Sequence, residues 1–206
     1  MIDRFALVLL RPIFERVAAV LAARGVTADQ ATLTGFGFGM AAAVMIGFGY
    51  PLLAILPLLL NRALDGLDGA LARRTAATER GAFLDIALDF LFYAAIPLAF
   101  AFCNPAQNAL AGAVLLAAFV GTGSSFLAFA IIAEKRGLKS TAYPSKSFYY
   151  LGGLTEGAET ILCFLAMCLW PPYFPVIAYV YAALCTITTV TRLLAGWTTF
   201  GGDVRS

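Results

Sequence analysis

Long apolar stretches without a charged residue constrain the fold of this 206-residue chain more than any other feature of its sequence. The run from Ala109 to Ile132 is one example, and a helix of about 20 such residues crosses the roughly 30 Å of hydrocarbon in a bilayer. These runs lack the alternating polarity of barrel strands, so helices are the expected spans. Hydrophobic residues make up 61% of the chain and charged residues only 13%. We therefore predict an all-α membrane protein in which residues 1–206 form a single domain.

Turn signals divide the chain into an N-terminal helix and six predicted transmembrane helices. Residues 1–24 mix arginines with apolar residues at helical spacing, which is typical of an amphipathic helix at the membrane interface. The six predicted spans cover residues 30–49, 52–73, 81–102, 107–133, 153–169 and 175–196, and form a bundle over residues 30–197.

The basic residues indicate how the bundle is oriented. Twelve of the 14 lysines and arginines lie in the N-terminal segment, in two of the loops or in the tail: Arg4, Arg11, Arg16, Arg24, Arg73, Arg74, Arg80, Lys135, Arg136, Lys139, Lys146 and Arg205. The positive-inside rule therefore predicts cytoplasmic termini and loops. We expect a multi-pass protein of a bacterial inner membrane with its active site facing the cytoplasm.

Composition also excludes some classes of function. The net charge of +2 is small, and no basic stripe with interleaved aromatics is present, so no nucleic-acid partner is expected. The four cysteines have no CxxC spacing and the chain has no histidine, which argues against a zinc site.

Four aspartates interrupt two of the predicted spans, where ionised carboxylates are costly. Asp65 and Asp68 are three residues apart, and Asp85 and Asp89 are four apart, so each pair shares one face of its helix. Because the connecting loop is short, the two helices should pack antiparallel and bring the four carboxylates together. Such a cluster favours hard cations such as Mg²⁺ or Mn²⁺.

The segment from Asp65 to Asp89 reads D-x2-D-G-x2-A-R-x7-G-x3-D-x3-D. This pattern resembles the signature of the CDP-alcohol phosphatidyltransferase family, which transfers a phosphatidyl or other substituted phosphate group from a CDP-alcohol to a hydroxyl acceptor and releases CMP. The resemblance implies phospholipid biosynthesis, with CDP-diacylglycerol as the expected donor. It also implies six transmembrane helices and a homodimer.

Site residues follow from the resemblance by position. Metal binding is implied for Asp65, Asp68 and Asp85, with Asp89 at the same centre, and the metal is expected to be two Mg²⁺ or Mn²⁺ ions. Asp89 is further implied as the catalytic base that deprotonates the acceptor hydroxyl. Nucleotide binding is implied for Gly69, Ala72, Arg73 and Gly81.

The acceptor pocket is predicted from intramembrane charges that the signature does not include. Glu156 and Glu159 share one face at the start of the fifth span, Arg192 lies inside the sixth, and Lys146 precedes the fifth. These residues would bind the acceptor, or they would pair with one another for structural reasons. The acids suit an amino-alcohol or polyol and the cations suit a phosphorylated acceptor, so the acceptor class stays open.

An alternative function uses the same acidic cluster. A membrane cation transporter or metal-binding protein also needs intramembrane carboxylates, but a transporter usually places them near the bilayer midplane. The predicted aspartates lie near the cytoplasmic ends of their helices, so the enzyme is the favoured interpretation.

Overall fold

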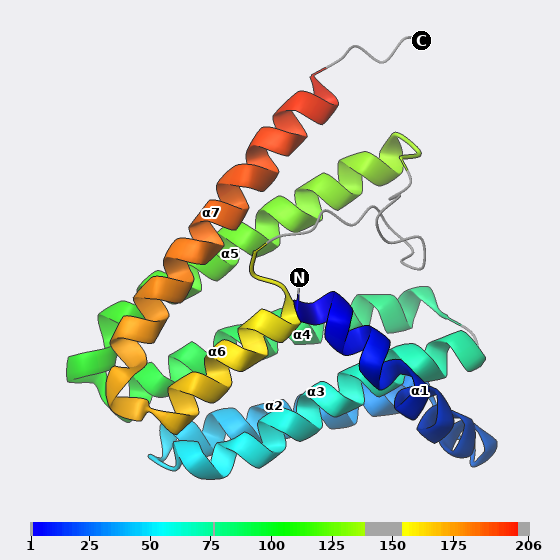
Figure 1. Ribbon diagram of the computed structural model, residues 1–206, viewed down its shortest axis with the longest axis horizontal. Coiled ribbons are helices and arrows are strands. Elements are labelled where there is room, and N and C mark those ends of the chain that lie inside the picture. Colours follow the sequence, from blue (N-terminus) through cyan, green and yellow to red (C-terminus); the bar gives the residue numbers. More distant parts are fainter. Residues whose placement is uncertain (1, 76, 139–153, 202–206) are drawn as a thin grey trace.

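The computed structural model describes residues 2–75, 77–138 and 154–201, with side chains from residue 11 onward. These parts are helical (Figure 1). The elements are α1 (Ile2–Ala23), α2 (Ala28–Gly47), α3 (Pro51–Arg74), α4 (Glu79–Cys103), α5 (Pro105–Lys135), α6 (Gly157–Leu169), the 3-10 turn η1 (Pro171–Tyr173) and α7 (Phe174–Phe200). The predicted order of helices is confirmed.

Capping residues explain where the helices begin. Thr27 accepts a hydrogen bond from the backbone N–H of Gln30, whose side chain accepts one from the Thr27 N–H, which together form a capping box before α2. Thr78 caps α4 in a similar way by accepting from the Gly81 N–H. The Thr78 cap therefore fixes where α4, the helix that carries Asp85, begins.

The helices pack as two connected groups. α2 packs on α3 and α4, and α1 and α6 pack on α3. α5 and α7 pack on each other and diverge from α2 and α3 toward their C-terminal ends (Figure 1). α4 joins the two groups because α5 packs on it.

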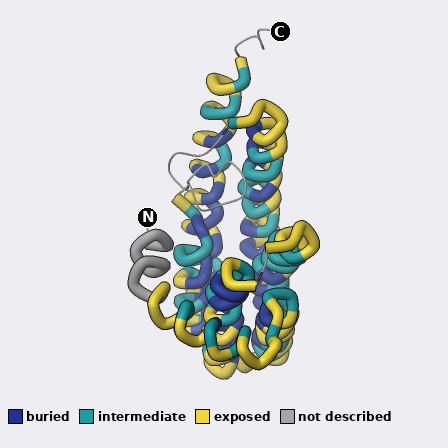
Figure 2. Tube along the Cα trace, turned by 90° about the vertical axis from the view of Figure 1, so that its right-hand side faces the viewer, coloured by how far each residue is buried: buried dark blue, intermediate teal, exposed yellow. Residues whose placement is uncertain are grey.

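Small residues and aromatic rings hold the bundle together. Gly39 of α2 lies so close to α4 that a β-carbon there would come within 2.6 Å of the Phe92 ring. Phe92 packs edge-on against Phe164 of α6, with ring centroids 6.0 Å apart. Both rings are fully buried. Exposed residues lie along the outer sides of the helices (Figure 2). Many of them are large hydrophobic residues, as expected of helices that face lipid.

Four helical segments within the described residues are long and apolar enough to cross a membrane: Ala28–Gly47, Glu79–Cys103, Pro105–Lys135 and Pro171–Phe200. This finding confirms an all-helical, membrane-bound protein. α3 is long enough but carries Arg62 and two aspartates, and α6 has only 13 residues. The prediction that six helices span the membrane and that α1 lies at the interface therefore stays a prediction.

Two helix boundaries differ by four residues from the expected ones: α7 ends at Phe200 instead of residue 196, and α6 begins later than expected. The fifth span was expected from residue 153, but α6 begins at Gly157, with Glu156 at its N-cap in an extended conformation. A β-carbon at position 157 would lie 3.2 Å from the Arg62 guanidinium. Glu156 therefore enters α6 in an extended conformation, and the first residue of the helix lies beside Arg62 of α3.

Candidate active site

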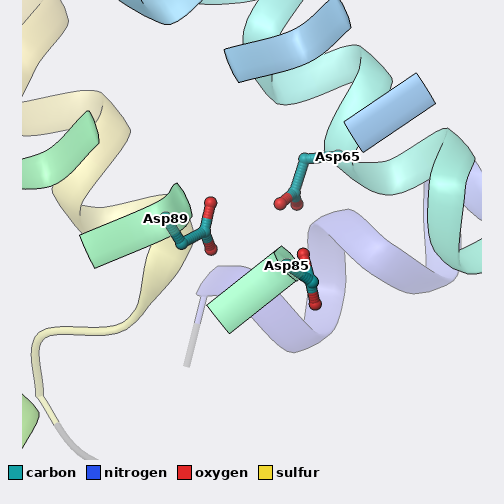
Figure 3. Close-up of side chains that lie close together, drawn as sticks. All are labelled: Asp65, Asp85 and Asp89. Carbon is teal, nitrogen blue, oxygen red and sulfur yellow. The ribbon is translucent and has the colours of Figure 1, made fainter. Parts of the chain in front are cut away.

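Three of the predicted aspartates, one from α3 and two from α4, lie close together. Asp65 comes from α3, and Asp85 and Asp89 come from one face of α4. One carboxylate oxygen from each lies within 4.8 Å of the other two, and the side chains point toward a common space (Figure 3). Within the described residues, α3 and α4 each pack on α2 rather than closely on each other, so the close pairing expected from the short connection is not observed, although the three carboxylates do come together.

Asp68 lies next to this group but has a different environment. It is buried, and its Oδ2 accepts a hydrogen bond from the Thr32 hydroxyl of α2 at 2.6 Å. Asp68 and Thr32 line a second, smaller cavity together with Asp65, Asp85 and Asp89. The four carboxylates thus occupy adjoining cavities, and α2 contributes to the second of them.

A cationic side chain accompanies the acidic group. Arg62 lies one turn before Asp65 on α3, and its guanidinium forms an ion pair with the Asp65 carboxylate. This pairing offsets part of the repulsion among carboxylates that are close together in a half-buried site.

A cavity of about 280 Å³ opens beside the three clustered aspartates. Its lining also includes Glu156 at the start of α6 and Arg192 of α7. Both residues are buried, and Arg192 donates a hydrogen bond to the Thr122 carbonyl oxygen at 3.1 Å. The cavity is therefore lined by carboxylates from α3 and α4 and by further polar residues from α5, α6 and α7.

The predicted acceptor residues divide into three cases. Glu156 and Arg192 line the same cavity as the aspartates, as their intramembrane positions suggested. Glu159 lies on α6 but is not part of the cavity lining. Lys146 lies outside the residues that the structure describes.

The residues predicted to bind nucleotide lie beyond the aspartates, toward the α3–α4 connection. At Gly69, a β-carbon would be 3.4 Å from the Arg73 guanidinium, and at Gly81 it would be 3.0 Å from Asp29 and Thr78. Ala72 is partly exposed, as are both glycines. These small residues leave parts of the α3 and α4 backbones exposed on the two helices that carry the aspartates.

Several residues in or near the site were not predicted from the sequence. Tyr93 lines the main cavity and lies four residues after Asp89, so helical periodicity could have indicated it. Thr155 and Thr160 also line the cavity, within the segment whose glutamates drew attention. Glu15 of α1 contacts Arg73 and Arg74, but it lies 58 residues before Arg73, and no local pattern links them.

The acidic group meets the requirements of a divalent cation site. Two ligands on opposite sides of an ion lie about 4 to 5 Å apart when each is about 2.0 to 2.6 Å from it. The three aspartates satisfy that separation, and they are the carboxylate donors that Mg²⁺ and Mn²⁺ prefer.

The fold and this site define a helical membrane protein with an acidic, cation-compatible cavity lined by residues of α3, α4, α5, α6 and α7. The family identity follows from sequence: residues 25–191 match the CDP-alcohol phosphatidyltransferase family, and the chain belongs to it. This membership places the protein among phospholipid-synthesising transferases rather than the cation transporters that an acidic cluster alone would allow.

Individual relatives agree with this assignment. The chain is 52% identical to the inner membrane protein YnjF of Escherichia coli over 97% of both chains. It is 39% identical over 83 residues to the archaetidylinositol phosphate synthase of Pyrococcus horikoshii, a match that covers 40% of this chain and 44% of that protein.

Solved structures show the same fold. The phosphatidylinositol phosphate synthase PgsA1 of Mycobacterium tuberculosis with CDP-DAG bound aligns with a TM-score of 0.72 at 24% identity, covering 91% of this chain and 94% of that one. The same enzyme in complex with manganese and citrate gives a TM-score of 0.71, covering 90% and 89%. The predicted fold class is thereby supported across nearly the whole chain.

Proposed function

We propose that the protein transfers a phosphatidyl or other substituted phosphate group from a CDP-alcohol, with CDP-diacylglycerol as donor, to a hydroxyl acceptor, and releases CMP. The observation that carries this proposal is the single cavity lined by Asp65, Asp85 and Asp89 together with Arg192 and Glu156. Such a cavity offers room for a donor phosphate beside the aspartates and an acceptor against α6 and α7.

The four aspartates would hold the metal. Asp65, Asp85 and Asp89 offer ligand atoms to a common position, and Asp68 offers a further carboxylate from the adjoining cavity, which supports two ions, Mg²⁺ or Mn²⁺. When bound, the metal would neutralise the donor diphosphate and stabilise charge on the leaving oxygen. The chain's own contribution is to hold these carboxylates in place from two helices.

The donor nucleotide would lie over Gly69, Ala72, Arg73 and Gly81. The absence of side chains at both glycines allows a flat base and its phosphates to approach the backbone. Arg73 adds a guanidinium, which suits phosphate recognition. The manganese-bound and CDP-DAG-bound structures of the M. tuberculosis relative are consistent with this chemistry on the same fold.

Asp89 would act as the base. Its carboxylate faces the same cavity as Glu156 and Arg192, so an acceptor held there would present its hydroxyl to Asp89. The acceptor oxygen then bonds to the phosphorus that carries the lipid group, the bond from that phosphorus to the CMP oxygen breaks, and the acceptor proton passes to Asp89. No covalent enzyme intermediate is needed.

The acceptor would bind between α6 and α7. Arg192 would attract a phosphate on the acceptor, whereas Glu156, Thr155 and Thr160 would accept from or donate to its hydroxyl groups. Lys146 remains a proposed member of the pocket, and Glu159 would contribute from outside the cavity lining. This mixed lining suits a polyol or a phosphorylated polyol.

We further propose how the protein is oriented in the membrane. α2 to α7 would make six membrane crossings in a single domain, α1 would lie at the interface, and both termini and the cavity would face the cytoplasm of a bacterial inner membrane. A homodimer would be the working state. Soluble acceptors and nucleotide would then reach the cavity from the cytoplasm.

The proposed function is tested directly by CMP release. The purified protein in lipid nanodiscs, with CDP-diacylglycerol and Mg²⁺ or Mn²⁺, is expected to release CMP when one acceptor from a panel is added. The panel contains glycerol 3-phosphate, serine, inositol, inositol phosphate and a second phospholipid. If no CMP is released with any acceptor of the panel or with other CDP-alcohols as donors, the proposal is contradicted.

Thr32→Val tests whether α2 supports the metal centre. Valine keeps the shape of threonine but removes the hydroxyl that donates to Asp68. Loss of a hydrogen bond that orients a metal ligand typically weakens metal affinity about tenfold or more, so we expect that change in Mn²⁺ affinity by calorimetry.

The control for this variant is Thr34→Val. The Thr34 hydroxyl donates to the Gln30 carbonyl oxygen within its own helix and contacts no aspartate in the described residues. It should leave Mn²⁺ affinity unchanged. Equal affinities in both variants would argue against Asp68 as a ligand that Thr32 orients.

A further inference from the structure

The N-terminal helix contacts the end of α3 through a charged cluster that the proposed chemistry has not used. Glu15 of α1 accepts hydrogen bonds at its Oε1 from the Nε of Arg73 at 3.2 Å and from a terminal nitrogen of Arg73 at 3.0 Å. Its Oε2 accepts from the Nε of Arg74 at 3.2 Å. One carboxylate therefore holds two consecutive arginines at the C-terminal end of α3.

The geometry gives Arg73 a defined orientation. Two of its three guanidinium nitrogens donate to Glu15, and the third, NH1, is the nearest atom to the position that a β-carbon would take at Gly69, at 3.4 Å. An arginine side chain in water samples many rotamers, and two hydrogen bonds to one carboxylate oxygen restrict that freedom. Glu15 thus keeps the Arg73 guanidinium over the Gly69 surface.

Glu15 is suited to this role at neutral pH. Hydrogen bonding from Arg73 and the charges of both arginines hold the pKa of the Glu15 carboxyl below its ordinary value. The carboxylate is therefore ionised under working conditions and retains both charge-assisted contacts.

The position of α1 is secured independently of this cluster. Phe14 packs on Gly66, where a β-carbon would lie within 2.6 Å of its ring, and Ala18 is fully buried in a small apolar cluster with Leu67, Ala70 and Leu71 of α3. Apolar packing seats the helix on α3 without needing Glu15. The Glu15 contacts can therefore be altered while α1 stays docked.

We propose that Glu15 is a positioning residue of the nucleotide site: from α1, it holds the Arg73 guanidinium where it meets the CDP moiety of the donor over Gly69. This inference rests on the proposed function, since it takes Arg73 as a nucleotide contact. It adds the N-terminal helix, which lies outside the family signature, to the donor-binding machinery. Glu15 touches neither donor nor acceptor and acts only through Arg73.

The test is a double-mutant cycle on donor binding. The full chain in nanodiscs with Mn²⁺ is titrated with CDP by calorimetry, and KM for CDP-diacylglycerol and kcat are measured by CMP release. Glu15→Gln keeps the side-chain shape and removes its charge. Because the pair is partly exposed, we expect about a threefold to fivefold rise in Kd and KM with kcat little changed.

The other variants distinguish a role of Glu15 in positioning Arg73 from a role in stabilising the fold. Arg73→Gln should raise Kd by about tenfold or more, and the double variant should match Arg73→Gln alone because Glu15 acts through that residue. Glu15→Asp should rescue part of the affinity. Arg16→Gln, an exposed neighbour on α1, should behave as the parent protein. Phe14→Ala should lower the thermal unfolding temperature, whereas Glu15→Gln should hardly change it.

Three results would overturn the inference. Parental Kd and KM in Glu15→Gln would show that its contacts do not position a nucleotide-binding group. Additive effects in the double variant would show that Glu15 does not act through Arg73. A fall in unfolding temperature as large as that of Phe14→Ala would mark Glu15 as a structural anchor. If the parent protein binds no CDP in the presence of metal, the proposed function fails and the inference falls with it.

Discussion

Asp89→Asn is expected to reduce CMP release by about a hundredfold to ten-thousandfold while the protein still folds and still binds CDP. Asparagine keeps the size of the side chain and much of its hydrogen bonding, but it cannot accept the acceptor's proton at neutral pH. Asp89 lines the cavity shared with Glu156 and Arg192, so the loss should fall on kcat. Single-turnover CMP release, with CDP affinity from calorimetry, measures both quantities.

A matched control for this variant lies on the same helix. Glu79→Gln removes an exposed carboxylate from the first turn of α4, outside the cavity lining, and should retain parental turnover. Normal turnover by Asp89→Asn would contradict the role of Asp89 as the catalytic base. If Glu156→Gln abolished turnover instead, the base would belong to α6.

Helical periodicity carried most of what could be predicted about this site. The three- and four-residue spacings within the two aspartate pairs place each pair on one face of its helix. The close pairing of α3 and α4 expected from their short connection is not observed in the described residues, because both helices pack on α2. Asp65, Asp85 and Asp89 do meet, and Arg192 reaches their cavity from more than 100 residues further along the chain. Intramembrane charge was the signal in each case.

Contacts between distant segments could not be predicted in the same way. Asp68 accepts from Thr32, and Arg73 contacts Glu15, because of how α1 and α2 are rotated as they pack on α3. That rotation depends on side-chain fits such as Phe14 against Gly66, which sequence spacing does not encode. The start of α6 is a similar case, since the Arg62 side chain lies beside Gly157.

Removing the divalent metal is expected to reduce CMP release to background, and Mn²⁺ should restore it. Among the aspartate variants, Asp65→Asn and Asp85→Asn should weaken Mn²⁺ binding most. Their carboxylate oxygens, one from each of two helices, lie close enough together to bind the same ion. Asp68→Asn should weaken it less or affect only one of two ions, since Asp68 lies in the adjoining cavity and its Oδ2 accepts from Thr32.

Mn²⁺ titration followed by electron paramagnetic resonance separates these outcomes, because it counts bound ions without requiring turnover. Asp29→Asn is the control: its carboxylate pairs with Arg80 near the start of α4 and should leave the ion count unchanged. Full activity in excess chelator would contradict a metal-dependent reaction. A parental ion count and affinity in Asp65→Asn and Asp85→Asn would instead place the metal elsewhere. If Asp68→Asn lost one ion and Asp65→Asn lost both, the two cavities would correspond to two metal positions that share Asp65.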